Sequence, residues 1–374
     1  MAKVNKQILW LSLGFFFIFF GYNAVQQYIT SFFSERGVPE VGFQSLIIVY
    51  LSFLISGPLS AVCVSKYGAK RSMLMGSVIY SLFIFILPFP NRIFIWLASM
   101  FLGFGSSLLW TGQNSYLVRA SDEKEYGANS GFFNTLLTLG FAAGVLFLGL
   151  LIAQLSFTIS FLAYSFLPLV GLLFLNKCED LRTKTVKNQL TLIKKSIKSI
   201  SALRLASFYF AFSFTLGLVI GILPIDIKNT LSLSYVGPLF FAFWIMSILF
   251  SYISGRISDI TGRKRMIVTS YGVGALGLVT LYLAQSQGAF LLTLGVFLLA
   301  IAYAIYQPMN FAFVGDVATE ENLVSLTAFF GMARNAGVLS ALFISSQILP
   351  AASYIAATIV FLLSFAILAP ILKA

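Results

Sequence analysis

The sequence predicts an all-α membrane protein whose twelve transmembrane helices form two pseudo-symmetric bundles of six. Composition is the first reason: 59% of the residues are hydrophobic, 10% are charged, and the mean hydropathy is +0.94. A soluble chain of this length does not need so much apolar surface, so the excess must face lipid. The chain divides into twelve apolar runs, each near the roughly 20 residues that a bilayer requires, and in lipid such runs form helices. The runs are 8–30, 42–64, 72–89, 92–116, 128–153, 156–176, 203–227, 233–256, 266–285, 289–314, 323–347 and 350–372.

The distribution of basic residues is the second reason. The formal charge of +12 is concentrated at the N-terminus and in the even-numbered connections, and the odd-numbered connections hold Arg36, Arg92 and Lys228. By the positive-inside rule both termini are cytoplasmic, and the inner (plasma) membrane is the expected location. The charge therefore reports orientation and predicts no nucleic-acid partner. The expected partners are the lipid bilayer and a small-molecule substrate, and a monomer is the default.

Internal repetition is the third reason. Shifted by 197 positions, residues 125–140 fall on residues 322–337, so that Gly140 meets Gly337. The stretch 177–202 is basic, polar and longer than the other cytoplasmic connections, and it divides the chain into an N-terminal bundle (1–176), a linker (177–202) and a C-terminal bundle (203–374). Its segment L-I-K-K-S-I-K-S-I has helical spacing with lysines on one face, which fits a membrane-surface helix or a solvated linker equally.

A glycine-marked basic turn, G-R-I-S-D-I-T-G-R-K-R, occupies residues 255–265 between two apolar runs. It resembles the signature loop of the major facilitator superfamily, G-x-x-x-D-x-x-G-R-K. We expect Gly255 to let two helices approach, Asp259 to end a helix and pair with a cation or a helix N-terminus, and Gly262 to take a positive φ. The basic residues that follow stay at the membrane surface; they are Arg263, Lys264 and Arg265. The alternative interpretation is an ordinary basic loop.

The first half contains a weaker copy of this turn, S-K-Y-G-A-K-R at residues 65–71, in which Gly68 matches Gly262 and Lys70 follows it. The resemblance implies the major facilitator fold, with a substrate cavity near the midplane between two six-helix repeats. It also assigns a conformational role to both turns. Asp259→Ala should then slow exchange between inward- and outward-open forms without abolishing substrate binding.

Residues 66–80 and 103–117 carry a narrower resemblance, to the uncoordinated-ninety-three-like branch of that superfamily. The matching positions are Gly68, Lys70, Gly76, Tyr80, Trp110, Gly112, Gln113, Tyr116 and Leu117. Some members of that branch act as accessory or trafficking proteins. The resemblance therefore implies the fold and leaves transport open, whereas the intact turn at 255–265 favours a transporter.

Arg334 is a charge deep in the eleventh run, about eleven residues or roughly 16 Å from its cytoplasmic end. Its first-half counterpart is Leu137. Intramembrane charges are costly and usually functional, and a guanidinium suits carboxylate or phosphate. We therefore expect Arg334 to bind an anionic substrate group. The alternative is a structural pair with a carboxylate or with carbonyls of a broken helix.

Polar side chains gather on a few of the other runs. The resemblance implies that helices 1, 4, 7 and 10 line the cavity, and three of these carry the polar residues. Interhelical hydrogen bonding is the alternative role for any one of them. The candidates beside Arg334 are Asn23, Gln26, Gln27, Trp110, Gln113, Asn114, Asn134, Tyr303, Tyr306, Gln307 and Asn310.

Two acidic residues are candidates for gating. Asp226 follows Pro224 near the outer end of the seventh run, where we expect it to pair across the outer gate or to lie exposed at the surface. Asp316 ends the tenth run at the inner face, and a contact from the acidic connection after it to a basic loop would help to hold the inner gate closed. No acid lies in the middle of a run and the chain has no histidine, which disfavours proton symport.

The sequence therefore predicts a secondary transporter that moves a small, anionic or polar organic solute by rocker-switch alternating access. The alternative is a non-transporting accessory or regulatory membrane protein of the same fold. Enzyme activity has no support, because no nucleophile with a base and no phosphate loop is recognisable. We expect no cofactor and no metal, and a disulfide between Cys63 and Cys178 is not expected on the cytoplasmic side.

Overall fold

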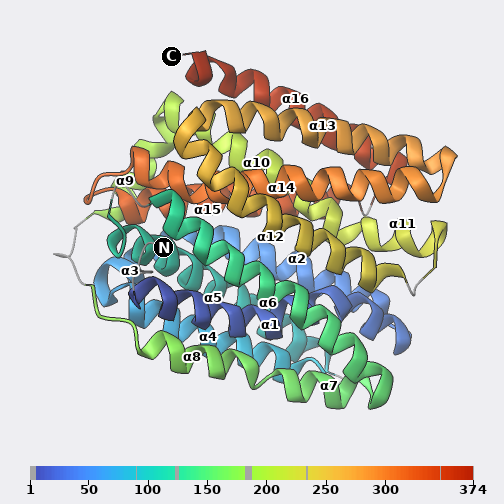
Figure 1. The fold of residues 1–374 in the computed structure, drawn as a ribbon. Helices are drawn as coiled ribbons and strands as arrows, with labels where there is room; N and C mark the ends of the chain where they lie inside the picture. Colours follow the sequence, from blue (N-terminus) through green and yellow to red (C-terminus); the bar gives the residue numbers. More distant parts are fainter. Residues whose placement is uncertain are drawn as a thin grey trace.

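The computed structural model describes residues 6–89, 91–122, 126–181, 188–232, 235–345 and 347–373. In these ranges the chain is built from sixteen helices. Most of them run side by side along one direction (Figure 1). Eleven are long and apolar enough to cross a membrane, and one bent helix pair brings the number to twelve. The expected all-α fold with twelve spans is confirmed.

The first six spans are formed by α1 to α8, and α9 lies in the linker that precedes the second six. The first group comprises α1 (Lys6–Glu35), α2 (Pro39–Ile55) with α3 (Gly57–Tyr67), α4 (Ala69–Ile86), α5 (Arg92–Arg119), α6 (Tyr126–Gln154), and α7 (Phe157–Tyr164) with α8 (Leu167–Asn176). After α9 (Gln189–Lys198) come α10 (Ile200–Gly221) with α11 (Leu223–Thr230), α12 (Val236–Thr261), α13 (Arg263–Gln287), α14 (Ala289–Val317), α15 (Leu323–Ser345) and α16 (Pro350–Lys373).

Proline marks the three places where a span is split into two helices. Pro58, Pro168 and Pro224 stand in the first two positions of α3, α8 and α11. Proline fits the first turn of a helix, where its missing N–H would have no partner, but it interrupts a helix that precedes it. A bend of 58° separates α2 from α3. These breaks explain why single apolar runs in the sequence become pairs of helices.

The two bundles repeat the same packing. Gly140 and Gly337 have no room for a side chain. A Cβ added to Gly140 would meet the backbone carbonyl oxygen of Phe16, and a Cβ added to Gly337 would meet that of Phe210, 194 residues further along the chain. The glycines therefore allow α6 to approach α1 and α15 to approach α10 equally closely. The aromatic neighbours repeat as well. Phe133 of α6 meets the Phe15 ring of α1, and Phe330 of α15 stacks on the Tyr209 ring of α10.

The two glycine turns have the same backbone conformation. Gly68 has φ 90° and ψ 157°, Gly262 has φ 87° and ψ 141°, and each amide donates to the carbonyl four residues earlier. A residue with a Cβ is strained at such positive φ values. The positive φ expected at Gly262 is confirmed. Gly255 is buried in α12, and the side chain of Asp259 lies outside the described residues.

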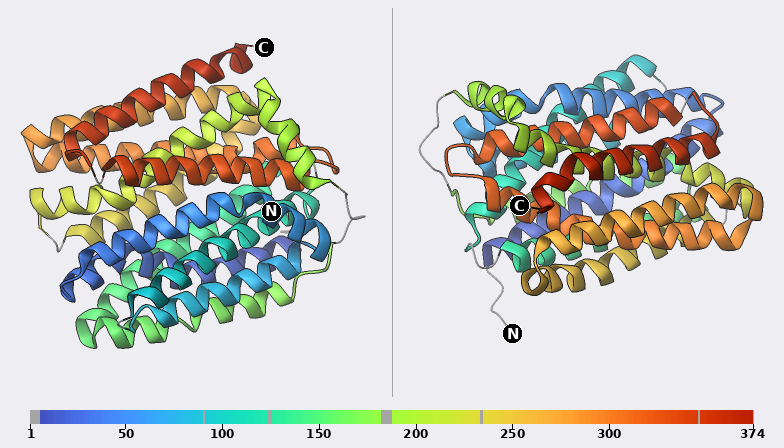
Figure 2. Two further views of the ribbon diagram at one scale, coloured as in Figure 1. Left: turned by 180° about the vertical axis from the view of Figure 1, so that it is seen from behind. Right: turned by 90° about the horizontal axis from the view of Figure 1, so that it is seen from above.

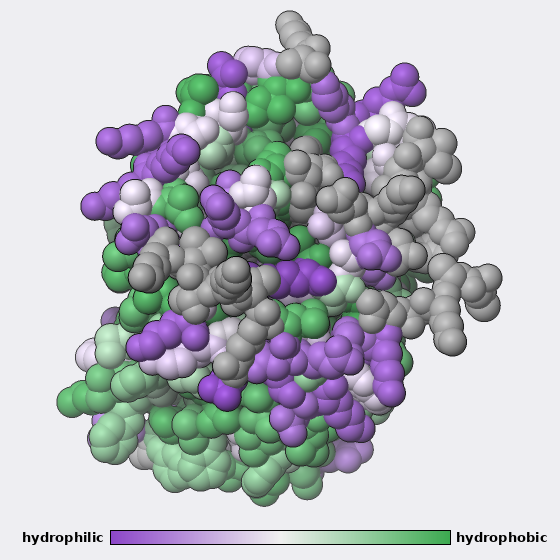
Figure 3. Space-filling model, turned by 90° about the vertical axis from the view of Figure 1, so that its left-hand side faces the viewer, coloured by the Kyte–Doolittle hydropathy of each residue, from purple (hydrophilic) through white to green (hydrophobic). Residues whose placement is uncertain are grey.

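One end of the molecule collects basic side chains. There α1 begins, α16 ends and α9 lies beside the start of α10 (Figures 1 and 2). Hydrophilic side chains are spread over this end, and a mainly apolar surface lies below them (Figure 3). We call it the basic end; its exposed cations include Lys66, Arg71, Lys194, Lys195, Lys198, Lys264 and Arg265. The bundles meet where α6 packs on α12 and α14, and where α2, α3 and α5 pack on α15.

Candidate solute-binding site between the two bundles

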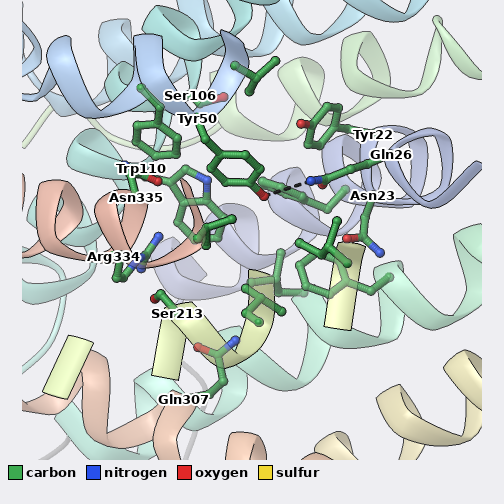
Figure 4. A pocket seen from close by; sticks show the side chains of 18 of the residues that line it. Tyr22, Asn23, Gln26, Tyr50, Ser106, Trp110, Ser213, Gln307, Arg334 and Asn335 are labelled. Atoms are coloured by element: carbon green, nitrogen blue, oxygen red, sulfur yellow. Dashed lines mark hydrogen bonds between the residues drawn. The ribbon is translucent and has the colours of Figure 1, made fainter. Parts of the chain in front are cut away.

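A cavity of about 120 Å³ lies between the bundles. Side chains of both halves converge on it (Figure 4). The aromatic and polar residues that line it are Phe19, Tyr22, Asn23, Gln26, Gln27, Tyr50, Phe53, Tyr80, Ser106, Trp110, Phe141, Ser213, Trp244, Tyr303, Tyr306, Gln307, Asn310, Arg334 and Asn335. The first six of these come from α1 and α2, and the last six from α14 and α15. The cavity is therefore formed jointly by the two repeats.

Equivalent positions of the two repeats line the cavity. Tyr50 and Trp244 are 194 residues apart, and Trp110 and Gln307 are 197 apart; all four lie in its wall. The pair formed by Leu137 and Arg334 lines it too. The repeated backbone thus supplies a symmetric frame, and the side chains carried at matching positions make the cavity asymmetric.

Arg334 lies half-way along α15 and is half-buried. Its guanidinium lies over the ring of Trp110, with Cζ 5.2 Å from the ring centroid. Within the described ranges it has neither an ion pair nor a hydrogen bond. An arginine at the centre of a membrane helix costs about 3 kcal/mol on insertion scales, and a cation–π contact returns about 0.5–2 kcal/mol. The structural carboxylate pair considered above is therefore absent among the described residues.

Arg334 also separates two cavities. Phe53, Trp110 and Asn335, together with Arg334, line both the central cavity and a smaller one of about 10 Å³. The smaller cavity continues toward the basic end, along the start of α3 and the first half of α15. This group of four residues therefore stands between the central cavity and the basic end.

The central cavity offers hydrogen-bond donors without partners. Within the described ranges the buried Nε1 of Trp244 makes no hydrogen bond, and the same holds for the Nδ2 atoms of Asn23, Asn310 and Asn335. An indole N–H can only donate, and no Asp or Glu is among the described residues that line the cavity. With the charge of Arg334, this wall suits a solute that brings hydrogen-bond acceptors and negative charge.

Most of the candidates from the sequence do reach the central cavity. Asn23, Gln26 and Gln27 line it from α1, where Gln26 Nε2 donates to the Tyr50 hydroxyl at 2.8 Å. From α14, Gln307 Nε2 donates to the Tyr303 hydroxyl at 3.0 Å. The remaining candidates in its wall are Trp110, Tyr306, Asn310 and Arg334. Their roles toward a substrate stay predictions.

Three candidates lie elsewhere. Asn114 lines the smaller cavity and not the central one. Gln113 and Asn134 line neither; both are fully buried, and their side-chain amide atoms have no hydrogen-bond partner within the described part of the chain. Their assignment to the cavity wall is wrong. For Gln113 the reason is helical periodicity. It lies three residues after Trp110, and at about 100° per residue its side chain points about 60° away from that of Trp110.

Ten aromatic or polar wall residues are not among the candidates from the sequence: Phe19, Tyr22, Tyr50, Phe53, Tyr80, Ser106, Phe141, Ser213, Trp244 and Asn335. Single aromatic and hydroxyl residues in an apolar helix give no signal that distinguishes a cavity wall from a lipid face. The repeat could have found some of them. Ser106 lies 197 residues before Tyr303, which was a candidate, and Asn335 directly follows Arg334.

Asp226 does not lie at a contact between the two halves. It is 3% exposed, and its Oδ2 accepts hydrogen bonds from the Tyr354 hydroxyl at 2.6 Å and from Gln285 Nε2 at 3.1 Å. These partners belong to α16 and α13 of its own bundle. Both the pairing across the outer gate and the exposed surface position are therefore wrong, because α11 turns the carboxylate inward.

At the inner gate, Asp316 has its side chain outside the described residues. The contact expected from the acidic connection after it to a basic loop stays a prediction. Cys63 and Cys178 are free in the structure. The described residues contain no group of three or more His, Cys, Asp or Glu side chains that could hold a metal ion.

Comparison with known proteins identifies the fold and the family. The human organic anion transporter MFSD10 (TETRAN) superposes with a TM-score of 0.78 over 98% of this chain and 100% of that one, at 16% identity, and shows the fold alone. UNC93-like protein MFSD11 of Xenopus tropicalis is 30% identical over 144 residues, and the putative potassium channel regulatory protein unc-93 of Caenorhabditis elegans is 31% identical over 121.

These relatives are matched over part of their length. The matched segments make up 38% and 31% of this chain, and 32% and 16% of the two relatives. The partial resemblance to the uncoordinated-ninety-three-like branch is thereby confirmed. The family model described as Major Facilitator Superfamily matches residues 11–209 and 205–373. Since these matches cover nearly the whole chain, this multi-pass integral membrane protein belongs to the Major Facilitator Superfamily.

Proposed function

We propose that the protein is a secondary transporter that moves a small, anionic or polar organic solute by rocker-switch alternating access. The observation that carries the proposal is Arg334, a charge without a partner among the described residues, in a cavity built by both bundles. A charge in this position is expensive unless a ligand uses it. The substrate anion would supply the missing counter-charge when it binds.

The cavity wall indicates the kind of solute. Its cation and unpartnered donors favour a carboxylate or a similar anion, and the aromatic side chains favour an apolar or planar remainder. About 120 Å³ is small beside the roughly 300–1,000 Å³ of sites for drug-sized ligands. We therefore expect a compact organic anion, and no catalysis on it.

Alternating access would use the four residues that stand between the central and the smaller cavity, among them Arg334 and Trp110. Opening toward the basic end requires Arg334 to move off Trp110, and binding of an anion gives the guanidinium a new partner. The turns at Gly68 and Gly262 would bias the equilibrium between the two forms, and Asp259 would act with them. We place the basic end at the cytoplasmic side, with both termini there, since cationic connections remain inside.

The test is counterflow in proteoliposomes that contain only this protein. Vesicles loaded with an unlabelled aromatic or aliphatic carboxylate should take up the labelled compound, and Arg334→Leu should abolish that uptake. Thermal unfolding of the purified protein with a panel of carboxylates, amines and sugars selects the compound, since a ligand at about 100 times its dissociation constant adds about 2.7 kcal/mol of stability. Stabilisation by amines and not by carboxylates would overturn the anion assignment.

The second candidate is a non-transporting accessory protein that binds another membrane protein. The similarity to the two relatives named above favours it, because one of them carries the name of a channel regulator. Counterflow separates the candidates. Uptake of any solute by vesicles holding this protein alone supports the transporter, whereas no uptake across a panel that also fails to shift thermal unfolding supports the accessory role.

A further inference from the structure

A second polar cavity, of about 460 Å³, opens at the basic end between α9, the start of α10 and the connection from α14 to α15. It shares no lining residue with the central cavity. Its walls are Leu192, Lys195, Ser196, Ser199, Ser201, Ala202, Leu205, Val317, Thr319, Glu321, Asn322, Leu326 and Phe330. The proposed transport cycle leaves this cavity without a role.

The cavity lies at the level of the lipid headgroups along the membrane normal. Two of its walls are the first turns of candidate membrane spans, which begin at Ile200 and Leu323. Residues just outside such starting points lie among lipid headgroups, and those just inside lie beside the upper acyl chains. The cavity therefore opens where a lipid presents its phosphate.

The lining divides into an apolar floor and a polar rim. Leu192, Leu205, Leu326 and Phe330 form most of the floor, and the rim carries an exposed lysine, three serines and an asparagine. The Asn322 side-chain oxygen accepts from the Thr319 amide at 2.7 Å, which leaves its NH₂ group to donate toward the cavity side. The arrangement fits an amphiphile with an acceptor-rich head.

Positive charge exceeds negative charge around the rim. Among the described lining residues Lys195 faces one acid, Glu321. Just outside the lining, Lys194 and Lys198 are exposed on α9 and Glu320 is exposed beside Glu321, so the surroundings carry three cations against two acids. Beside these lysines, Ile197 and Ile200 expose 45% and 61% of their surface. Exposed isoleucines interleaved with lysines at the start of a span are typical of a helix that rests on an anionic membrane surface.

We propose that this cavity binds the headgroup of an anionic phospholipid from the leaflet at the basic end. Lys195 would pair with the phosphate, and Ser199, Ser201 and Asn322 would donate to its oxygens. The acyl chains would lie along Ile197 and Ile200. Binding would also fix α9. Gln189 of that helix contacts Ser65 of the first bundle and Ser325 of the second, so a lipid that holds α9 stabilises the contact between the bundles at the basic end.

The test measures lipid binding to the purified full chain by native mass spectrometry, with phosphatidylglycerol and phosphatidylcholine titrated separately. We expect phosphatidylglycerol to bind more tightly. Each basic residue near an anionic surface contributes about 1 kcal/mol, so Lys195→Gln should weaken its binding about fivefold. Lys195→Arg should retain it. The matched control is Arg71→Gln, which removes one charge from the basic end in the other bundle and should leave the affinity unchanged.

Three outcomes would overturn the proposal. Equal binding of phosphatidylcholine would remove the need for a charged headgroup. The same loss in Arg71→Gln as in Lys195→Gln would reduce the effect to net charge. Displacement of the lipid by millimolar inorganic phosphate would assign the site to a free anion. Because the cavity is separate from the central one, failure here leaves the transport proposal standing, and loss of counterflow leaves the lipid site standing.

Discussion

The two six-helix bundles share their packing and differ in their charges. In each, a glycine of the fifth or eleventh span lies against a carbonyl of the first or seventh, and an aromatic pair between the same two helices precedes it. At the matched positions in the cavity wall, however, the first bundle has Leu137 and the second has Arg334. Close packing of two helices requires a small residue at a fixed position, so the glycines occur in both bundles. Recognition of an anion requires one charge, so the arginine occurs in one bundle.

The outer ends of the bundles differ in the same way. In the first bundle the ring of Phe32 packs against Phe157 and Phe161 of α7, with centroids 5.6 and 4.9 Å apart. Asp226, 194 residues after Phe32, instead accepts two hydrogen bonds from α13 and α16. One bundle closes this end with apolar contacts and the other with a buried carboxylate, so we expect the second to be more sensitive to substitution there.

The largest effect is expected from removing the asymmetry in the cavity. Arg334→Leu gives the second bundle the side chain of the first, and it should weaken binding of an organic anion about 100-fold, because a charged hydrogen-bonded contact contributes about 1.5–3 kcal/mol. Isothermal titration calorimetry in detergent measures this loss of affinity. Leu137→Met is the matched control, because it changes the equivalent wall position without changing the charge.

The same substitution should leave the unfolding temperature without ligand unchanged or raised. Arg334 has no partner to lose among the described residues except the ring of Trp110. Early unfolding of Arg334→Leu with unchanged anion affinity would show that the arginine is structural. The double variant Leu137→Arg, Arg334→Leu sharpens the comparison, since it moves the charge to the matching wall position and should restore part of the affinity.

A smaller effect is expected from the hydrogen bonds of Asp226. Tyr354→Phe removes the shorter of its two bonds and leaves a buried carboxylate with one donor. The free energy of unfolding should fall by about 2 kcal/mol, since losing the partner of a buried charged group carries its desolvation cost. The control in the other bundle is Phe161→Leu, for which we expect about 1 kcal/mol. An equal or larger loss in the control would refute the expected difference between the bundles.

The repeated glycines should respond equally. Gly140→Ala and Gly337→Ala each force a Cβ against a carbonyl oxygen of the neighbouring helix, and each should lower the free energy of unfolding by about 1.5 kcal/mol. Gly131→Ala is the control, because no atom lies within 4 Å of the added Cβ, and it should be neutral or stabilising. Thermal unfolding in one detergent compares all three, and unequal losses at the paired glycines would argue against the structural repeat.

The smallest effect is expected at the turns. Gly68→Ala and Gly262→Ala place a Cβ at φ near 90°, which costs about 1 kcal/mol. At Gly262 no atom lies within 4 Å of the added Cβ, so the backbone strain is the whole expected cost there. Chemical denaturation that monitors the whole chain should give similar losses for both variants. Counterflow by these variants separately reports whether the turns bias the two forms of the transporter, and an unchanged rate in both would remove their conformational role.

The sequence alone determined the class of the protein and much of its plan. Lipid forbids unpaired backbone groups, so long apolar runs had to be helices, and the repeat with its glycines indicated two like bundles. Arg334 could be recognised because a charge in the middle of an apolar run is costly. The proline breaks at Pro58 and Pro168 were not predicted, although proline at such positions does end a preceding helix.

Tertiary structure decided which polar side chains meet. Gln113 and Asn134 were expected in the cavity wall and lie elsewhere, whereas Tyr50 and Trp244, which were not among the candidates, line the cavity. Asp226 read as a surface or gate residue and became the centre of a buried hydrogen-bond group. Hydropathy specifies that a segment is a helix in lipid, but the rotation of that helix about its axis is set by its neighbours, and that rotation determines which side chains reach the cavity.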